Sequence, residues 1–173
     1  AEFAAVLVRA LGLPANGTSS FTAVASTDWF SGAVGTAASY GLVLGYGDGS
    51  FGPNNNITRQ EAMAMMQRAA KVAEFSGKTS ELTAFSDAAS VSDWAVSAAQ
   101  YNVGSGLIVG DNGQLRPNDP ITRAESATVI LRLLQKAGLV DVRSATCVFP
   151  SVSKVQFSRS FGGRPPLAAR VFF

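Results

Sequence analysis

One phrase occurs twice along this chain, and the repeat restricts the possible folds more than any single motif does. Each copy carries an Asp-Trp pair, a glycine-containing turn, a Pro-Asn pair and an Ile-Thr-Arg-x-Glu segment. The offset is 65 residues between Trp29 and Trp94 and 64 residues between Arg59 and Arg123. A nearly constant offset predicts a repeat array, in which each copy buries its apolar face against neighbouring copies.

A third, partial copy stands at the beginning of the chain. When Glu2 is aligned with Glu61 and Glu125, one column of arginines also forms, and it consists of Arg9, Arg68 and Arg132. We therefore expect that the sequence begins inside a repeat and that position 1 is not its natural start. The organisation that follows is the end of a first repeat over 1–20, a second repeat over 21–80, a third repeat over 81–140, and a basic tail or the start of a further segment over 141–173.

Apolar residues at helical spacing predict a mainly α-helical fold. The predicted helices with the aligned glutamates span 2–13, 58–74 and 122–138, and those that precede the glycine turns span 30–41 and 92–103. The first should bury Val6, Leu7 and Leu11 against the other two glutamate helices, because so short a helix is marginal alone in water. Short strand-like links are expected at 42–44 and 107–109.

Helix ends carry recognisable signals. Two capping boxes, Thr58-x-x-Glu61 and Thr122-x-x-Glu125, predict the starts of two helices. For the other two internal helices the candidate caps are Thr27 or Asp28 and Ser92 or Asp93, and the candidate stop residues are Gly41 and either Gly104 or Gly106.

Composition excludes several classes of site. The chain has no His, which removes Ser-His-Asp and Cys-His catalysis and histidine-based zinc sites, and Cys147 has no second Cys for an intrachain disulfide. Residues 1–140 hold 9 Lys/Arg and 11 Asp/Glu, so they lack the basic character of a nucleic-acid interface. No apolar run approaches the roughly 20 residues that span a bilayer. We expect no metal, no cofactor, no nucleic-acid partner and no membrane insertion.

Arg59 and Arg123 fall at the first residue of their predicted helices, where a cation is mildly unfavourable. The capping box explains the Thr and the Glu of each copy but not the Arg. Two interpretations stay open: an ordinary surface arginine, or an arginine that contacts an anionic partner beside the free helix amides. We favour the second because the disfavoured residue occurs twice.

The glycine turn over 45–49 invites comparison with known loops. A dinucleotide-binding loop should run directly into a helix, but Pro53 and an Asn-Asn-Asn run intervene. A calcium loop that starts at Asp48 would need Glu at its twelfth position, where Arg59 stands. A tight turn that requires positive φ and a turn that lines a ligand site both remain open.

These residues resemble the S-layer homology domain family, whose phrase is close to Phe-x-Asp, Trp, Ala, Gly-Tyr-Gly-Asp-Gly-x-Phe-x-Pro and Ile-Thr-Arg-Ala-Glu-Phe. The matching positions are Phe21, Trp29, Ala33, 45–51, Pro53 and 57–61 in the second copy, and Phe85, Asp87, Trp94, Ala98, Gly110, Gly113, Pro117 and 121–125 in the third. The resemblance covers about 1–140. The departures are the absent first Thr-Arg, Ala23 for Asp, Gln60 for Ala, and a shorter turn without Tyr at 109–111.

The resemblance implies a pseudo-threefold helical repeat with a central bundle of the three Thr-Arg-x-Glu helices. It also implies grooves that bind anionic, pyruvylated secondary cell-wall polysaccharide, and thereby noncovalent anchoring of a secreted surface protein to the bacterial cell wall. The ligand-binding residues that it implies are Arg59, Arg123, Trp29, Trp94, Gly45, Tyr46, Gly47, Asp48, Gly110 and Asp111. Core packing is the alternative role for the two tryptophans.

Two other functions compete with the carbohydrate-binding anchor. The first is a structural protein–protein interaction module, with self-association in a surface lattice. The second, a carboxylate-based glycosidase, would need nearly duplicate active sites at Asp48 and Asp111, so we expect no enzyme. We also expect the groove that contains Tyr46 to bind more tightly, because Asp111 would repel an anionic sugar in the other.

Overall fold

The structure of the protein is a computed structural model that describes residues 1–141. Within them the chain forms α1 (Glu2–Ala10), α2 (Ser31–Ser39), α3 (Arg59–Val72), a 3-10 turn at Ala88–Ser90, α4 (Asp93–Gly104) and α5 (Arg123–Lys136). The expectation of strand-like links at 42–44 and 107–109 was wrong. The β-structure of residues 1–141 consists of isolated β-bridges, and none of them lies in these two segments. The predictions about the tail and Cys147 lie outside the described residues.

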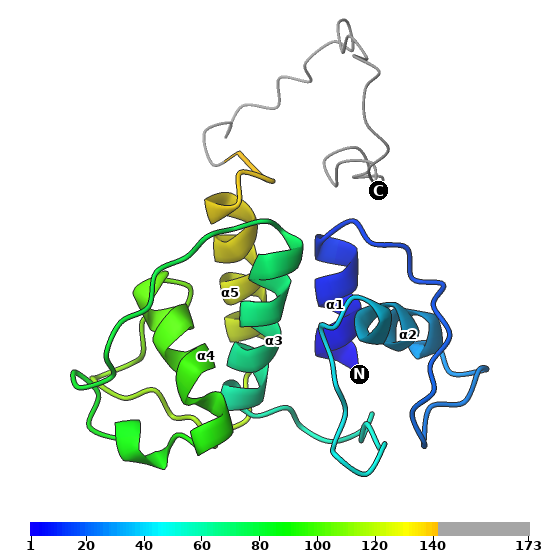
Figure 1. Cartoon of the computed structure of the whole chain (residues 1–173), viewed down its shortest axis with the longest axis horizontal. Coiled ribbons are helices and arrows are strands. Elements are labelled where there is room, and N and C mark those ends of the chain that lie inside the picture. The colour runs from blue at the N-terminus through cyan, green and yellow to red at the C-terminus, as the bar shows by residue number, and fades with distance from the viewer. Residues whose placement is uncertain (142–173) are drawn as a thin grey trace, which may run out of the picture.

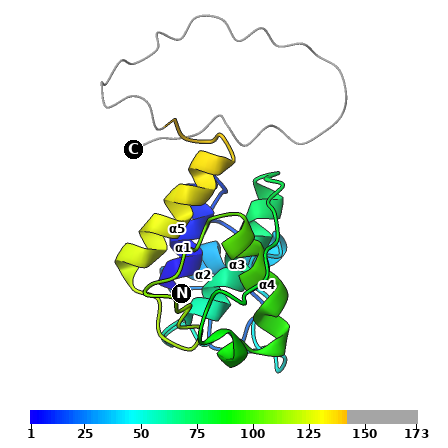
Figure 2. The same ribbon diagram turned by 90° about the vertical axis from the view of Figure 1, so that its left-hand side faces the viewer.

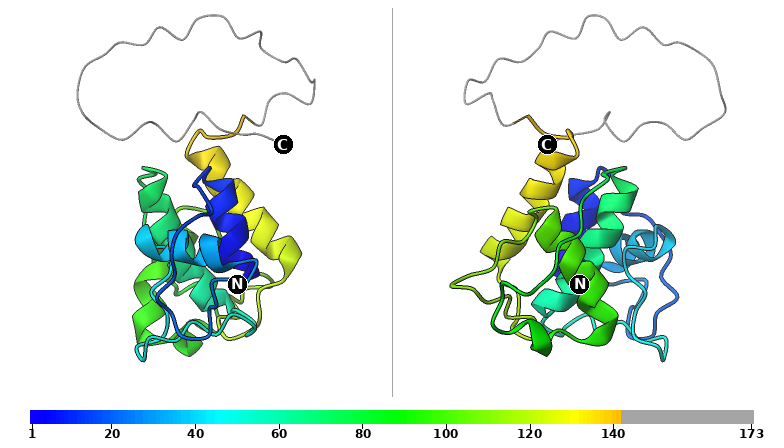
Figure 3. Two further views of the ribbon diagram at one scale, coloured as in Figure 1. Left: turned by 90° about the vertical axis from the view of Figure 1, so that its right-hand side faces the viewer. Right: turned by 60° about the vertical axis from the view of Figure 1, so that its left-hand side comes forward.

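The three helices with the aligned glutamates form the centre of the molecule. Helix α5 contacts both α1 and α3, while α2 packs on α1 and α4 packs on α3, so α2 and α4 lie on opposite sides (Figure 1). Two further views show α1 and α5 side by side (Figures 2 and 3). The mainly α fold with a central three-helix bundle is therefore confirmed. No helix in the described part of the chain is long and apolar enough to cross a membrane.

One hydrophobic core joins the three central helices. It includes Leu7 of α1, Met66 of α3 and Leu133 of α5, none of which has exposed surface. Leu11 is buried as predicted, but the expectation for Val6 was wrong, because 46% of this residue is exposed. Val6 lies on the wall of a groove, described below, that no other helix of residues 1–141 fills.

All five α-helices end in the same backbone motif. Two residues beyond each helix, a residue with positive φ turns the chain, and the next amide bonds back to a carbonyl inside the helix, as in Leu42 N to Ala37 O at 2.8 Å. Four helices use Gly at the positive-φ position, whereas α3 uses Glu74 with φ 54°. The predicted stops at Gly41 and Gly106 are confirmed. Helices α1, α2, α3 and α5 end earlier than predicted because this turn follows them, whereas α4 ends at Gly104, one residue later than predicted.

Helix starts follow the predictions in part. Both capping boxes are present, with Thr58 and Thr122 as the N-caps of α3 and α5. The prediction of Thr27 or Asp28 as the cap of α2 was wrong: α2 begins at Ser31, and the Asp28 carboxylate instead accepts a hydrogen bond from the Ala25 amide at 2.8 Å. Ser92 occupies the N-cap position of α4, but its side chain makes no capping bond.

Two of the three central helices, α1 and α3, begin on the proline loop of the next repeat. The Gln60 amide at the start of α3 donates to Pro117 O at 2.9 Å, and the Arg59 amide donates to Asp119 O at 2.9 Å. The Ala1 amine at the start of α1 donates to Pro53 O at 2.8 Å in the same way. Amides that we expected to be free for an anion at the start of α3 are therefore already bonded within the protein.

The positive φ of Glu74 leads to the first testable prediction. Glu74→Gly should raise the free energy of unfolding by about 1 kcal/mol, because glycine adopts the left-handed region without the steric cost that other residues meet there. Urea denaturation of both variants would measure the change.

The matched control is Gly41→Ala at the equivalent position after α2. An added Cβ meets no atom within 4 Å there, so any loss of stability comes from the φ of 68° alone. A destabilising Glu74→Gly would show that the Glu74 side chain contributes a contact that outweighs its backbone conformation.

Candidate functional site

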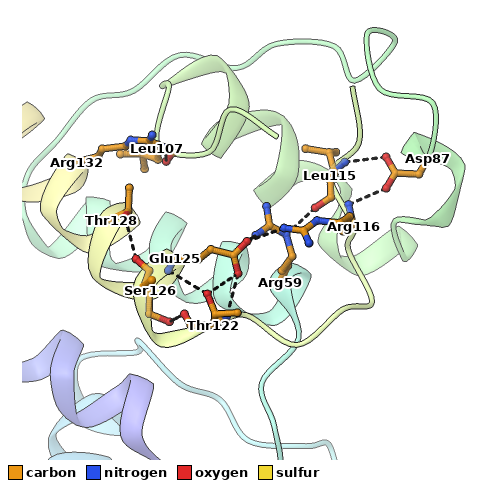
Figure 4. A network of polar contacts seen from close by, with 11 residues as sticks. Arg59, Asp87, Leu107, Leu115, Arg116, Thr122, Glu125, Ser126, Thr128 and Arg132 are labelled. Carbon is orange, nitrogen blue, oxygen red and sulfur yellow. Dashed lines mark hydrogen bonds and ion pairs between the residues drawn. The ribbon is translucent and has the colours of Figure 1, made fainter. Parts of the chain in front are cut away.

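Arg59 joins the second repeat to the third. Its Nε donates to Leu115 O at 2.7 Å and its Nη1 to Glu125 Oε1 at 2.6 Å, and only 7% of its side chain is exposed. Arg116 donates to the same carboxylate oxygen at 2.7 Å, so two guanidinium groups share Glu125 (Figure 4). Our expectation that Arg59 is partly exposed at a helix mouth was wrong, because the turn of the next repeat covers it.

Arg123 also joins two repeats, but its side chain is exposed to solvent. It reaches from the third repeat to Glu2 of the first, with Nη2 2.6 Å from Oε1 and Nε 3.2 Å from Oε2. Its side chain is 87% exposed. In the described residues no turn equivalent to that around Leu115 lies over this pair, so Arg123 is the motif arginine that solvent and ligands can reach.

Asp87 holds the turn that covers Arg59. Its two carboxylate oxygens accept hydrogen bonds from the amides of Leu115 at 2.8 Å and Arg116 at 2.7 Å. These bonds support Arg116 in a conformation with φ 51°, which non-glycine residues rarely adopt. The second repeat has Ala23 in place of this aspartate and Gly52 in place of Arg116, so its turn needs no such support.

The charge network lowers the pKa of both carboxyl groups at its centre. Burial by itself would raise the pKa of Glu125, but hydrogen bonds from Thr122 and the charges of Arg59 and Arg116 together outweigh it and hold the pKa below its ordinary value. Burial likewise acts to raise the pKa of Asp87, and the amides of Leu115 and Arg116 outweigh it.

A groove of about 1060 Å³ opens beside α1. It is lined by residues of all three repeats, including α1, the turn of the second repeat, α3 as far as Arg68 and the start of α5. Three large aromatic residues on its walls are exposed: Trp29 to 65%, Trp94 to 58% and Tyr46 to 44%. Exposure of this extent argues against the alternative that the tryptophans are core residues.

The groove holds more basic than acidic side chains. Arg9, Arg68 and Arg123 line it together with Glu2 and Glu61. Burial lowers the pKa of Arg68, and the hydrogen bond and charge of Glu2 raise the pKa of Arg123. The groove thus offers three guanidinium groups beside exposed aromatic faces, which suits a ligand with both anionic groups and apolar ring faces.

Only part of the predicted residue set meets in this groove. Arg123, Trp29, Trp94, Gly45 and Tyr46 line it. The other predicted residues do not: they are Arg59, Gly47, Asp48, Gly110 and Asp111. The groove that contains Tyr46 therefore also contains Arg123, and the sequence alone could not pair them.

The two glycine turns have structural as well as lining roles. A Cβ on Gly45 would stand 2.6 Å from the Phe21 ring, and one on Gly110 would stand 2.5 Å from the Phe85 ring. Asp48 is used within its own turn, where its carboxylate accepts from the Ser50 amide at 2.9 Å. The tight-turn interpretation thus holds for 47–49, while Gly45 and Tyr46 lie on the groove wall.

Sequence reasoning missed several groove residues. Arg9 and Arg68 stood in an aligned column with Arg132, but the column was assigned no role. Arg132 instead donates to Leu107 O at 3.0 Å and does not line the groove. The three consecutive asparagines at 54–56 also line it, and a run of exposed amides after a glycine turn is the signal that could have identified them.

The family model of the S-layer homology domain matches residues 20–63 and 84–127. The chain is also 35% identical, over 139 residues, to a protein named Surface-layer 125 kDa protein from Lysinibacillus sphaericus, an alignment that covers 78% of this chain and 12% of that protein. It is 39% identical over 109 residues to the Cellulosome-anchoring protein of Acetivibrio thermocellus, covering 62% of this chain and 24% of that protein.

A third relative is the Middle cell wall protein of Brevibacillus brevis, with 45% identity over 74 residues, 40% of this chain and 7% of that protein. The chain therefore spans less than a quarter of the length of these three relatives.

The different settings of the two motif arginines lead to a stability prediction. Arg59→Ala should lower the free energy of unfolding by about 3 kcal/mol, because it leaves Glu125 and Leu115 O without a buried partner. Arg123→Ala should leave the melting temperature nearly unchanged, since exposed ion pairs contribute little. Thermal unfolding followed by circular dichroism would compare them, and equal losses in the two variants would contradict the assignment.

The lowered pKa values predict loss of stability in acid. A group whose pKa is lower in the folded state stabilises the fold while ionised, and this contribution disappears as pH falls below the pKa of the unfolded state. The free energy of unfolding should therefore fall as the pH drops through the ordinary range of carboxyl groups. Urea denaturation at several pH values should show that the free energy of unfolding depends less on pH in Glu125→Gln and in Asp87→Asn than in the wild type. If both variants kept the pH dependence of the wild type, these two carboxyl groups would not be its source.

Proposed function

The chain belongs to the S-layer homology domain family, and on that basis we propose that it anchors a surface protein by binding an anionic cell-wall polysaccharide in the groove beside α1. Domains of this family bind cell-wall polymers, and the protein is a secreted, cell-wall-associated one. The observation that carries the proposal is that exposed aromatic side chains and three arginines lie together in one groove.

The aromatic residues supply the apolar part of a sugar site. The faces of Trp29, Trp94 and Tyr46 are open to solvent over the groove, and flat aromatic faces pack against the C–H faces of sugar rings with little loss of conformational freedom. The amides of Asn54, Asn55 and Asn56 provide donors and acceptors for hydroxyl groups.

Arginine in the groove favours an acidic polymer. Arg123 presents Nε and Nη2 together, which is the geometry that takes a carboxylate through two parallel hydrogen bonds. Glu2 occupies that geometry in this structure and stands in for a carboxylate ligand. We propose that a pyruvate ketal on the polysaccharide provides the ligand carboxylate, and that the chain is a binding module without catalytic activity.

One observation favours the second candidate function, contact with other proteins in a surface lattice. Helix α4 covers one face of α3. The equivalent face of α5 is exposed, and Leu131 on that face has 46% of its surface in solvent. Analytical ultracentrifugation of the wild type and Leu131→Gln would test this candidate, which requires an oligomer that the substitution weakens.

Binding to isolated cell-wall polymer tests the anchor. Arg123→Gln should weaken binding about tenfold or more, through loss of a charge-assisted contact, and Trp29→Ala should weaken it about fivefold or more. Isothermal titration calorimetry with polymer before and after removal of pyruvate would measure both effects, and the depyruvylated polymer should no longer distinguish Arg123→Gln from the wild type.

The matched controls are Lys71→Gln and Tyr40→Ala. Both residues are exposed and neither lines the groove, so both variants should bind as the wild type does. If polymer binds equally to all four variants, the groove is not the binding site. If depyruvylated polymer binds wild type unchanged, the anchor stands but pyruvate recognition does not.

A further inference from the structure

Two Asn-Gly pairs occur in the chain, at Asn16–Gly17 and Asn112–Gly113. Such a pair loses ammonia when the backbone nitrogen of the glycine attacks the side-chain amide carbon of the asparagine, and glycine has no side chain to block this attack. The reaction needs a free backbone nitrogen and room for the chain to rotate. The fold therefore decides which of the two pairs reacts.

Asn112 and Gly113 form the tip of an exposed turn in the third repeat. Their φ angles are 47° and 72°, as in the two-residue turns that favour Asn-Gly. At the base of the turn the Asp111 amide donates to Gln114 O and the Gln114 amide donates to Asp111 O, both at 2.9 Å. Residues 111–114 are all exposed, and a Cβ on Gly113 would meet no atom within 4 Å. Local opening of this short turn is therefore enough to let the tip rotate.

The attacking nitrogen of this turn is free within the described part of the chain. The Gly113 carbonyl accepts from the Ser86 amide at 3.0 Å, but the Gly113 nitrogen donates to no acceptor in residues 1–141. The Asn112 side chain likewise makes no hydrogen bond to any of these residues. Attack on the Asn112 amide therefore does not require that a hydrogen bond of either reacting group breaks first.

The fold protects the other Asn-Gly pair. The Gly17 amide donates to Gly32 O and to Thr36 Oγ1, both at 3.1 Å, so its nitrogen is occupied. A Cβ on Gly17 would overlap the Thr36 nitrogen and stand 2.5 Å from the carbonyl carbon of Gly35, so this segment lies directly against the backbone of α2. Asn16 can therefore react only after Gly17 has left α2 and lost both hydrogen bonds.

The equivalent turn of the second repeat is protected in another way. It has Asp48–Gly49 at the corresponding positions, and the Gly49 amide donates to Tyr46 O at 2.9 Å. The Asp48 carboxylate accepts from the Ser50 amide at 2.9 Å, and an ionised carboxylate is a poorer electrophile than an amide. Among these three pairs, only the one in the third repeat combines an amide electrophile with a free nitrogen.

We propose that Asn112 is a site of spontaneous deamidation, whereas the fold preserves Asn16. The Gly113 nitrogen loses its proton to solvent and bonds to Asn112 Cγ. The Cγ–Nδ2 bond then breaks, and the nitrogen takes a proton from solvent and leaves as ammonia, which closes a five-membered succinimide. Water opens this ring. Cleavage between Cγ and the glycine nitrogen gives an aspartyl residue, and cleavage at the backbone carbonyl gives an isoaspartyl linkage, whose main chain has one additional carbon.

The isoaspartyl product changes the turn that covers Arg59. This turn leads directly into Leu115, whose carbonyl accepts from Arg59 Nε at 2.7 Å and whose amide donates to Asp87 at 2.8 Å. An additional main-chain carbon between Asp111 and Gln114 does not fit a turn closed by two hydrogen bonds between these residues. Deamidation would thus loosen the contact between the second and third repeats.

Ageing the folded chain in mildly alkaline buffer made with heavy-oxygen water tests the site. Mass spectrometry of fragment ions after proteolysis should show that residue 112 acquires heavy oxygen at least about tenfold faster than residue 16, since each hydrogen bond that must break first costs about this factor in rate. In denaturant the two rates should be similar. Equal rates in the folded chain, or a difference that persists in denaturant, would overturn the proposal.

Two variants separate the added carbon from the added charge. Asn112→Asp has the charge alone and should melt as the fresh wild type does, because Asp tolerates the left-handed conformation. The wild-type chain, aged until methyl transfer by an isoaspartyl-specific methyltransferase detects extensive isoaspartate, should melt about 3 °C or more lower. Asn112→Gly, which cannot deamidate and suits this turn, should keep its melting temperature on equal ageing.

These melting temperatures also state what would contradict the effect on the turn. An aged wild type that melts like the fresh chain would show that the isoaspartyl linkage leaves the contact between the repeats intact. An equal fall in aged Asn112→Gly would place the damage at another residue. Either result overturns the proposed consequence for the turn around Arg59.

Discussion

The contact on which the structure depends is the one between Arg59 and Glu125. The carboxylate caps its own helix through Thr122, and it receives guanidinium groups from the preceding repeat and from its own turn. A single side chain thus fixes the start of α5, the position of α3 and the shape of the turn around Arg116 (Figure 4). Because the arginine is buried, removing Glu125 would leave an uncompensated charge inside the protein, whereas removing Arg59 would leave Glu125 paired with Arg116 alone.

This arrangement explains why a disfavoured residue occurs at the first position of the helix. A cation beside the positive end of a helix dipole is unfavourable by itself, but Arg59 points across to the next repeat, and the amides of its helix bond to Pro117 O and Asp119 O. The same type of residue has a different environment in the third repeat, where Arg123 stays exposed on Glu2. Burial by the neighbouring repeat therefore decides whether the motif arginine lies inside the fold or is exposed to solvent.

The groove beside α1 combines parts that are far apart in the chain. Arg9 and Arg123 are separated by most of the described residues, yet both line it with Trp29 and Tyr46. Glycine at position 45 is required because the Phe21 ring lies where a side chain would begin, so the turn can carry Tyr46 to the groove wall. The chemistry of the site thus follows from contacts between repeats.

The sequence by itself determined the local elements. Apolar spacing, capping boxes and the 64-residue offset fixed five helices and the repeat, because helical periodicity and caps are properties of neighbouring residues. The family resemblance, and with it the central bundle, came from residues such as Trp29 and Arg59. Tertiary structure alone decided that Arg59 is buried, that Arg9 and Arg68 line the groove while Gly110 and Asp111 do not, and that α2 lacks a side-chain cap. Burial and pairing depend on which repeat lies against which, and that order is set by contacts between residues 52 to 121 positions apart.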